Sequence, residues 1–264
     1  MPEPTLTVPV WSWWIFPLLF LTGAAAGFVD SIAGGGGVIT IPVLLNLGMP
    51  AQLALGTNKL QASFGSGSAA WHYRQAGLVQ LKDCRTGILM TLAGAALGSL
   101  TVSRLHPDFL QQAIPWLLLA IVVYLMLQPK VGLRDTPPRL KPMSFYLLFG
   151  ALIGFYDGFF GPGTGTFWAM AFVTVLGLEL RRATAHTKLM NFTSNVVSLA
   201  VFAAVGQVDL KAGICMGLGQ CAGARLGSRL VIHRGVRWIR PIFIAAALVI
   251  TARLLWLNFF SRFS

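Results

Sequence analysis

The sequence predicts an all-α polytopic membrane protein made of two inverted-topology repeats, with interrupted or re-entrant helices. Three observations predict this fold class. First, 55% of the 264 residues are hydrophobic and only 11% are charged, whereas about a quarter are charged in an ordinary soluble domain. Second, a glycine-rich motif with one aspartate occurs twice. Third, basic residues are concentrated in alternate loops between the apolar runs.

The apolar runs predict the membrane spans. A spanning helix needs roughly 20 apolar residues, and backbone amides in lipid must be satisfied within their own segment, so we expect helices and no strands. No Lys or Arg precedes the first run, which we interpret as a membrane helix rather than a signal peptide. The long runs lie near residues 11–33, 84–103, 109–128, 143–160, 187–205, 212–228 and 238–259, with shorter pieces near 37–48, 52–71 and 164–177.

The repeat is visible as GFVDSIAGGGG from residue 27 and GFYDGFFGPGTG from residue 154. Copies of one unit keep a nearly constant separation, which chance matches between glycines do not. Asp30 and Asp157 are separated by 127 positions, and Lys59 and Lys188 by 129 after a two-residue insertion. We therefore expect residues 1–128 to form the first transmembrane repeat, 129–142 a cytoplasmic linker and 143–264 the second transmembrane repeat.

The net charge of +12 is interpreted as topology rather than as a nucleic-acid site. The basic loops are expected to be cytoplasmic, and the other loops, with few basic residues, external. The basic loop 72–85 corresponds to the sparse loop 206–213, so the copies should be inverted and the amino terminus external. The basic set is Arg74, Lys82, Arg85, Lys130, Arg134, Arg139, Lys141, Arg181, Arg182, Arg229, Arg234, Arg237 and Arg240, and the sparse set is Arg104, Lys211, Arg253 and Arg262.

The glycine clusters predict broken helices at membrane depth. Each glycine costs about 1 kcal/mol relative to alanine inside a helix, and Pro162 interrupts the second copy. The half-helices that follow would point amide groups at an anion near the membrane centre. The candidate amides are those of Gly35, Gly36, Gly163 and Gly165. The alternative role, close helix packing, is instead expected for Gly94, Gly98, Gly223 and Gly227, which have the small-xxx-small spacing.

Lysines and asparagines follow each glycine cluster. Ionisable residues inside a span are costly unless they face a cavity or a partner, so Lys59 and Lys188 are candidate anion ligands. The amides of Asn58, Asn191 and Asn195 are candidate side-chain donors. An open alternative is that both lysines extend to the lipid headgroups from the ends of their helices.

The two aspartates have three possible roles. Asp30 and Asp157 could couple transport to a cation or proton, could pair with the lysines, or could cap the helix that follows them. His72 and His186 are assigned no role. The three cysteines show no metal-binding spacing and are expected to be buried free thiols.

Other function classes have less support. No phosphate loop, HExxH or GxSxG motif is present, which argues against an enzyme, and no cofactor or metal is expected. The expected partners are a small anionic substrate and the lipid bilayer, with no nucleic acid, and a homo-oligomer remains open. The alternatives are a cation-coupled carrier of another solute, an anion channel, and a membrane assembly or receptor subunit without flux.

The two motifs, together with TNKLQ from Thr57, ATAHTKLMN from Ala183 and GARLGSR from Gly223, strongly resemble those of the TauE/SafE family of sulfite-exporter-like membrane proteins. The resemblance covers nearly the whole chain. It implies a multi-pass transporter of the bacterial inner membrane for sulfite, thiosulfate or an organosulfonate such as sulfoacetate, with the amino terminus periplasmic. The second copy departs from four glycines to Gly-Pro-Gly-Thr-Gly, so the halves are expected to contribute unequally.

Overall fold

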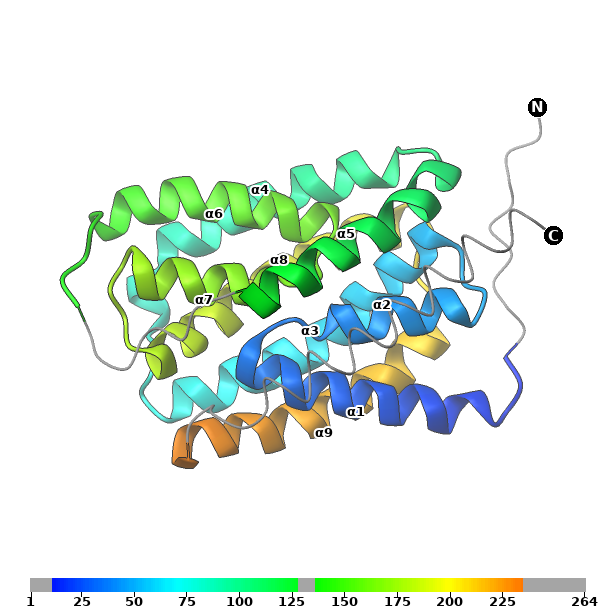
Figure 1. The fold of residues 1–264 in the computed structure, drawn as a ribbon, viewed down its shortest axis with the longest axis horizontal. Coiled ribbons are helices and arrows are strands. Elements are labelled where there is room, and N and C mark those ends of the chain that lie inside the picture. The colour runs from blue at the N-terminus through cyan, green and yellow to red at the C-terminus, as the bar shows by residue number, and fades with distance from the viewer. Residues whose placement is uncertain (1–10, 128–135, 235–264) are drawn as a thin grey trace.

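The computed structural model describes residues 11–127 and 136–234, and within these ranges the chain is helical and contains no strand (Figure 1). Most helices lie roughly along the long axis of the molecule. The elements are α1 (Ile15–Ala33), α2 (Gly37–Asn46), α3 (Ala51–Gln75), η1 (Leu81–Cys84), α4 (Arg85–Ser103), α5 (Pro107–Leu127), α6 (Pro142–Phe159), α7 (Thr164–Thr174), α8 (Leu180–Ala204) and α9 (Leu210–Arg234).

These helices agree with the predicted spans except at two places. Three stretches of the described chain are long and apolar enough to cross a membrane: Ile15–Ile32, Leu81–Ser103 and Pro107–Tyr124. The predicted short piece 52–71 is part of α3, and the run predicted from 187 begins at Leu180 in α8. Both helices have 25 residues, which corresponds to a length of about 37 Å at 1.5 Å per residue. Because both contain many polar residues, their apolar runs in the sequence are shorter than the helices. The predicted span 238–259 and linker residues 128–135 lie outside the described residues.

The surface of the described chain carries many large apolar side chains, while many polar ones are inside. Leu89, Leu97, Trp116 and Leu152 are each at least 60% exposed. Lys59 and Lys188, by contrast, are among the largest fully buried side chains. An apolar exterior around a polar interior suits a protein whose solvent is lipid. The chain is an all-α membrane protein.

The helix boundaries recur along the chain. Shifting α1 and α2 by 127 positions reproduces α6 and α7 to within one residue, and shifting α3 by 129 gives the bounds of α8. The same shift of 129 places η1 and α4 on α9. In Figure 1, α1 runs from right to left and α2 returns to the right, whereas α6 runs from left to right and α7 returns to the left.

Long helices pack in two corresponding pairs, α1 against α9 and α4 against α6, and α3 and α8 lie against each other between them. Glycines make the close approaches possible. A Cβ atom added at Gly94 or Gly98 would collide with the backbone of α6, and one at Gly223 or Gly227 with the backbone of α1. The predicted packing role of these four glycines is confirmed.

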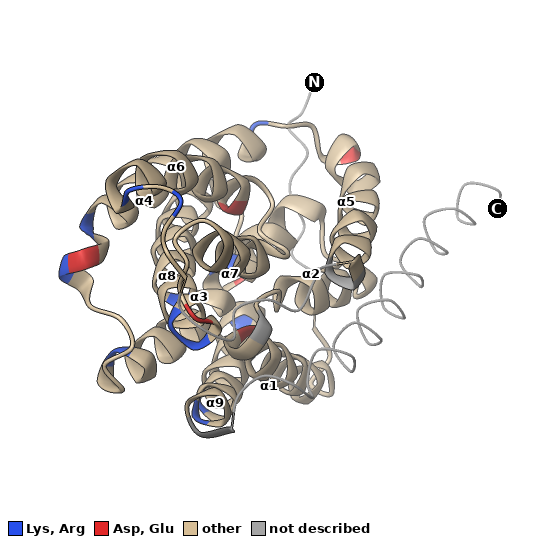
Figure 2. Cartoon of the chain, turned by 60° about the vertical axis from the view of Figure 1, so that its left-hand side comes forward, with Lys and Arg blue, Asp and Glu red and all other residues tan. Residues whose placement is uncertain are grey.

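The described loops at the two ends of the molecule differ in charge. Basic residues gather at the left-hand end of Figure 1, where α3 and α9 end and α4, α6 and α8 begin, and Figure 2 turns this end towards the viewer. Of the predicted cytoplasmic set, Lys130, Arg134, Arg237 and Arg240 lie outside the described residues, as do Arg253 and Arg262 of the external set. The three cysteines are free, but only Cys84 is buried, while Cys215 and Cys221 are half-buried.

Candidate functional site

The two predicted helix breaks are present. α1 ends at Ala33 and α2 begins at Gly37, and α6 ends at Phe159 and α7 begins at Thr164. The connecting backbone adopts positive φ at Gly34 (74°), Gly35 (108°), Gly161 (97°) and Gly163 (80°). L side chains rarely adopt these angles, so glycine is what allows the chain to turn back within four residues.

The breaks contact each other inside the protein. A Cβ atom added at Gly34 would lie 2.5 Å from the carbonyl carbon of Gly165, and one added at Gly165 would lie 2.7 Å from Gly34 Cα. The first break and the start of α7 therefore contact each other through backbone atoms, with no side chain between them. Two segments that are more than 120 positions apart in sequence form one site.

Two reciprocal ion pairs connect the copies at this site. Lys59 Nζ in α3 lies 2.7 Å from Asp157 Oδ1 in α6, and Lys188 Nζ in α8 lies 3.0 Å from Asp30 Oδ2 in α1. Each lysine is the ninth residue of its helix and is almost fully buried. The alternative in which the lysines extend to the headgroups is therefore wrong, and the alternative in which they pair with the aspartates is confirmed.

Asp30 also caps the first break. Its Oδ1 accepts hydrogen bonds from the backbone N–H groups of Gly35 (3.0 Å) and Gly36 (3.2 Å). These two amides were predicted to hold a ligand anion, and in this structure they hold a carboxylate of the chain itself. The physical reason is proximity, since Asp30 precedes them by only five and six residues. A ligand would have to compete with Asp30 for both amides.

The second break is built differently. Pro162 stands where the repeat places Gly35, and proline has no N–H to donate. Asp157 Oδ2 instead accepts a hydrogen bond from the Ser194 hydroxyl, and Lys59 also donates to the backbone carbonyl of Asp157. The two carboxylates are therefore neutralised alike by lysines but held by different hydrogen-bond donors.

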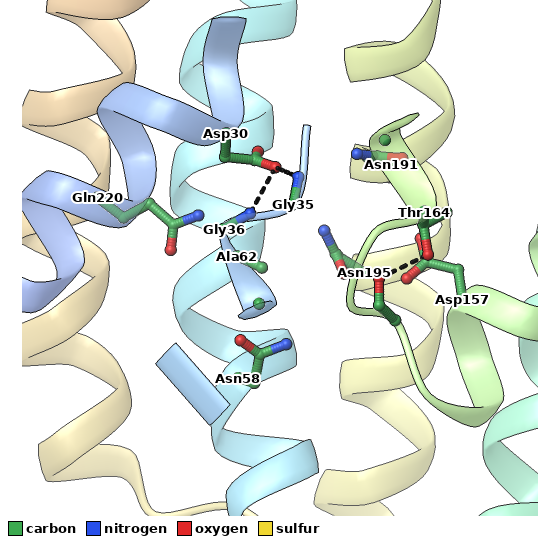
Figure 3. Close-up of a pocket in the computed structure, with 13 residues that line it drawn as sticks. Asp30, Gly35, Gly36, Asn58, Ala62, Asp157, Thr164, Asn191, Asn195 and Gln220 are labelled. Atoms are coloured by element: carbon green, nitrogen blue, oxygen red, sulfur yellow. Dashed lines mark hydrogen bonds between the residues drawn. The ribbon is translucent and has the colours of Figure 1, made fainter. Parts of the chain in front are cut away.

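A small cavity of about 30 Å³ lies between the breaks (Figure 3). Predicted site residues that do not line it are Lys59 and Lys188, which contact its carboxylates, and Gly163, where a Cβ atom would meet Ile121. Predicted site residues that line it are Asp30, Gly35, Gly36, Asn58, Asp157, Gly165, Asn191 and Asn195, and further lining residues are Gly37, Ala62, Gly161, Thr164 and Gln220.

Three asparagine carboxamides border the cavity. Asn58 Oδ1 accepts hydrogen bonds from Thr40 Oγ1 (2.6 Å) and Gln61 Nε2 (2.7 Å), which fixes the side chain with its nitrogen towards the cavity (Figure 3). The nitrogens of Asn191 and Asn195 also point inward. A ring of neutral donors around two lysine-neutralised carboxylates is suited to a small polar ligand that accepts hydrogen bonds.

Of the five lining residues that the sequence did not predict, Gln220 has the longest polar side chain. It is polar within the apolar run of α9, and the corresponding residue of the first copy is Thr91. This departure from the repeat was the signal that could have found it. Within the described residues, no group of three His, Cys, Asp or Glu side chains is placed to hold a metal ion.

Fold and site together define a polytopic α-helical membrane protein with a polar, charge-paired centre between two broken helices. The family model described as sulfite exporter TauE/SafE matches residues 19–254, and the chain belongs to this family.

Several relatives carry the name probable membrane transporter protein. One from Sinorhizobium sp is 47% identical over 91% of this chain and 92% of its own length. Another, from Escherichia coli, is 46% identical over 90% and 89%, and one from Haemophilus influenzae is 43% identical over 92% and 95%. No solved structure matches the chain significantly.

Proposed function

We propose that this protein is a secondary transporter that moves a small sulfur-containing anion across the bacterial inner membrane by alternating access. Sulfite, thiosulfate and organosulfonates such as sulfoacetate are the candidate substrates. The observation that carries the proposal is the contact between two helix breaks beside a cavity bordered by inward-pointing amide donors. The family description and the names of the relatives support the same activity.

The arrangement of the breaks supplies the alternating access. If the copies are inverted-topology repeats, the α1–α2 hairpin enters from one side of the membrane and the α6–α7 hairpin from the other. Because α1 and α3 pack on α9, and α6 and α8 pack on α4, the groups that rock against each other would be α1–α3–α9 and α4–α6–α8, and this movement would open the cavity to each side in turn. With room for only a water molecule or two, the cavity must widen before an anion can enter.

The ion pairs couple ligand binding to this movement. Both pairs join a lysine of one copy to an aspartate of the other, and both connect the α1–α3–α9 group to the α4–α6–α8 group, so separating these groups stretches both. Removing one partner from a buried pair costs about 3–5 kcal/mol, because a charge is left uncompensated. An incoming anion can replace the Asp30 carboxylate beside Lys188 and at the amides of Gly35 and Gly36, which lowers that cost.

Flux into proteoliposomes tests the proposal. We expect saturable uptake of sulfite, thiosulfate or sulfoacetate, mutual competition among these anions, and no inhibition by an organic cation. Accumulation against a concentration gradient, when a second gradient is imposed, would exclude a channel. We expect Lys188→Ala to abolish uptake, whereas Lys82→Ala, which removes an exposed lysine in η1, leaves it unchanged. Purified wild-type protein that takes up none of the three anions would refute the proposal.

A further inference from the structure

Gln220 reaches the cavity through a passage between two glycines. The residue is only 1% exposed and belongs to α9. A Cβ atom added at Gly27 of α1 would lie 2.7 Å from Gln220 Cγ, and one added at Gly65 of α3 would lie 2.7 Å from Nε2 and 2.8 Å from Cδ. Both approaches are closer than real Cβ atoms make, so the side chain takes its path because these two positions lack side chains.

The equivalent passage between α4 and α8 is closed. The repeat places Ser194 at the position of Gly65 and Thr91 at the position of Gln220. Ser194 donates to Asp157, and the Thr91 hydroxyl lies 3.5 Å from Met190 Sδ. One passage thus combines a long side chain, Gln220 of the second copy, with Gly65 of the first, and the equivalent passage combines the shorter Thr91 of the first copy with Ser194 of the second. These differences compensate in volume, so the extended glutamine fits without loss of packing.

The Gln220 carboxamide is a buried polar group that has no hydrogen-bond partner among residues 11–127 and 136–234. Its Oε1 accepts no hydrogen bond, and among the described residues none is made by its nitrogen either. Figure 3 shows that nitrogen pointing towards Asp30 and Gly36 across the edge of the cavity. A buried donor without an acceptor costs about 1–3 kcal/mol, and an oxygen of a ligand anion in the cavity could accept from this nitrogen, whereas Oε1 would stay without a donor. The serine at the equivalent passage is already satisfied.

We propose that Gln220 binds the transported anion and sets its specificity, so that the ligand sits on the Asp30 side of the cavity. This inference rests on the proposed transport function. A carboxamide N–H can donate to one oxygen of an oxyanion while the asparagines donate to others, which a single-atom halide cannot match. On the Asp157 side, Ser194 holds the carboxylate and Pro162 has no backbone amide, so the donors there are the side chains of Asn191 and Asn195.

Two variants separate ligand binding from packing. Gln220→Met keeps the length of the side chain and removes its donors. Gly65→Ser combined with Gln220→Thr installs the pair of residues that the chain already packs in its other copy. The matched control is Gln52→Met, because Gln52 is also buried but donates to the carbonyl of Leu105 (2.7 Å), away from the cavity.

The readouts are the KM and maximal rate of sulfite, thiosulfate and sulfoacetate uptake, and the inhibition of uptake by chloride. Loss of a hydrogen bond to a charged ligand predicts a KM about tenfold higher in both Gln220 variants, a maximal rate within about twofold of wild type, and stronger relative inhibition by chloride. Gln52→Met should keep the wild-type KM.

The outcomes are distinct. Wild-type KM and chloride inhibition in the Gln220 variants, with active wild-type protein, would overturn the role of Gln220 and leave the transport function standing. Absence of uptake by the wild type would overturn both. If Gln220→Met does not yield folded protein, the KM of the Gly65→Ser, Gln220→Thr double variant tests the role of Gln220 by the same criterion.

Discussion

Asn195 donates a hydrogen bond from Nδ2 to Ser66 Oγ over 3.3 Å, and the two residues are 129 positions apart, the separation of the repeat. Equivalent positions of two copies can meet only near the axis that relates the copies. This contact between α8 and α3 therefore places that axis beside the cavity, which Asn195 lines.

The contact between the breaks should be sensitive to a single methyl group. Gly34→Ala places a Cβ atom 2.5 Å from the Gly165 carbonyl carbon, in a residue with φ of 74°. Gly48→Ala is the matched control, because its φ is 84° but nothing lies within 4 Å. We expect both variants to be destabilised by their positive φ, and Gly34→Ala, whose ψ of 151° lies in a region almost exclusive to glycine, to lose several degrees more in melting temperature and most of its uptake. Equal losses in the two variants would contradict this account of the breaks.

The glycine-mediated helix pairs lead to a second prediction. Gly223→Val forces α9 away from α1, because a Cβ atom there collides with the carbonyl of Ala24. The neighbouring Ala222→Val is the control, since Ala222 is exposed on the same helix. Overpacking costs about 1–3 kcal/mol or more when backbone must move, so we expect a lower melting temperature in detergent for Gly223→Val alone. A similar melting temperature for both variants would argue against close α1–α9 packing.

The two ion pairs should respond differently to exchange of their charges. Lys59→Ala or Lys188→Ala alone should cost about 3–5 kcal/mol. Exchanging the partners, as in Lys59→Asp with Asp157→Lys, should recover part of the lost stability. The Ser194 hydroxyl, which donates to Asp157, can also accept a hydrogen bond from a lysine at position 157. The exchange of Lys188 and Asp30 should recover less, because the amides of Gly35 and Gly36 repel a lysine. Thermal melting in detergent measures the difference, and equal recovery would show that the amides contribute little.

Labelling of introduced cysteines tests the orientation in the membrane. With Cys84, Cys215 and Cys221 replaced by alanine, Lys82→Cys should react with an impermeant maleimide only after the cells are opened. Lys211→Cys, at the opposite end of the molecule, should react in intact cells. Both residues are exposed in the structure. Labelling of the two sites from the same side would contradict the predicted topology.

Local and periodic features were predictable from the sequence. Both breaks were predicted because the cost of consecutive glycines and of proline is a property of the segment itself. The packing of Gly94 and Gly223 followed from their spacing. The end of α3 and the start of α8 were less accessible, because helices with a buried polar face do not form continuous apolar runs.

Contacts between the copies could not be predicted in the same way. The sequence left three roles open for Asp30 because the partner, Lys188, is 158 positions away and is brought close only by the tertiary fold. That Gly35 and Gly36 hold the Asp30 carboxylate depends instead on the local turn of the break, whose geometry the sequence motif does not specify. Gln220 was missed because its route to the cavity depends on glycines of two other helices.

The proline at the second break bears on kinetics. Because Pro162 offers no amide to Asp157 while Asp30 has two, the unloaded protein should not be energetically balanced between its inward-facing and outward-facing forms. The less populated form shows a weaker apparent affinity, since part of the binding energy is used to reach it. The substrate concentration that gives half-maximal uptake should therefore differ between the two faces of the membrane. The imposed gradients, and not this bias, would still determine the net direction of flux.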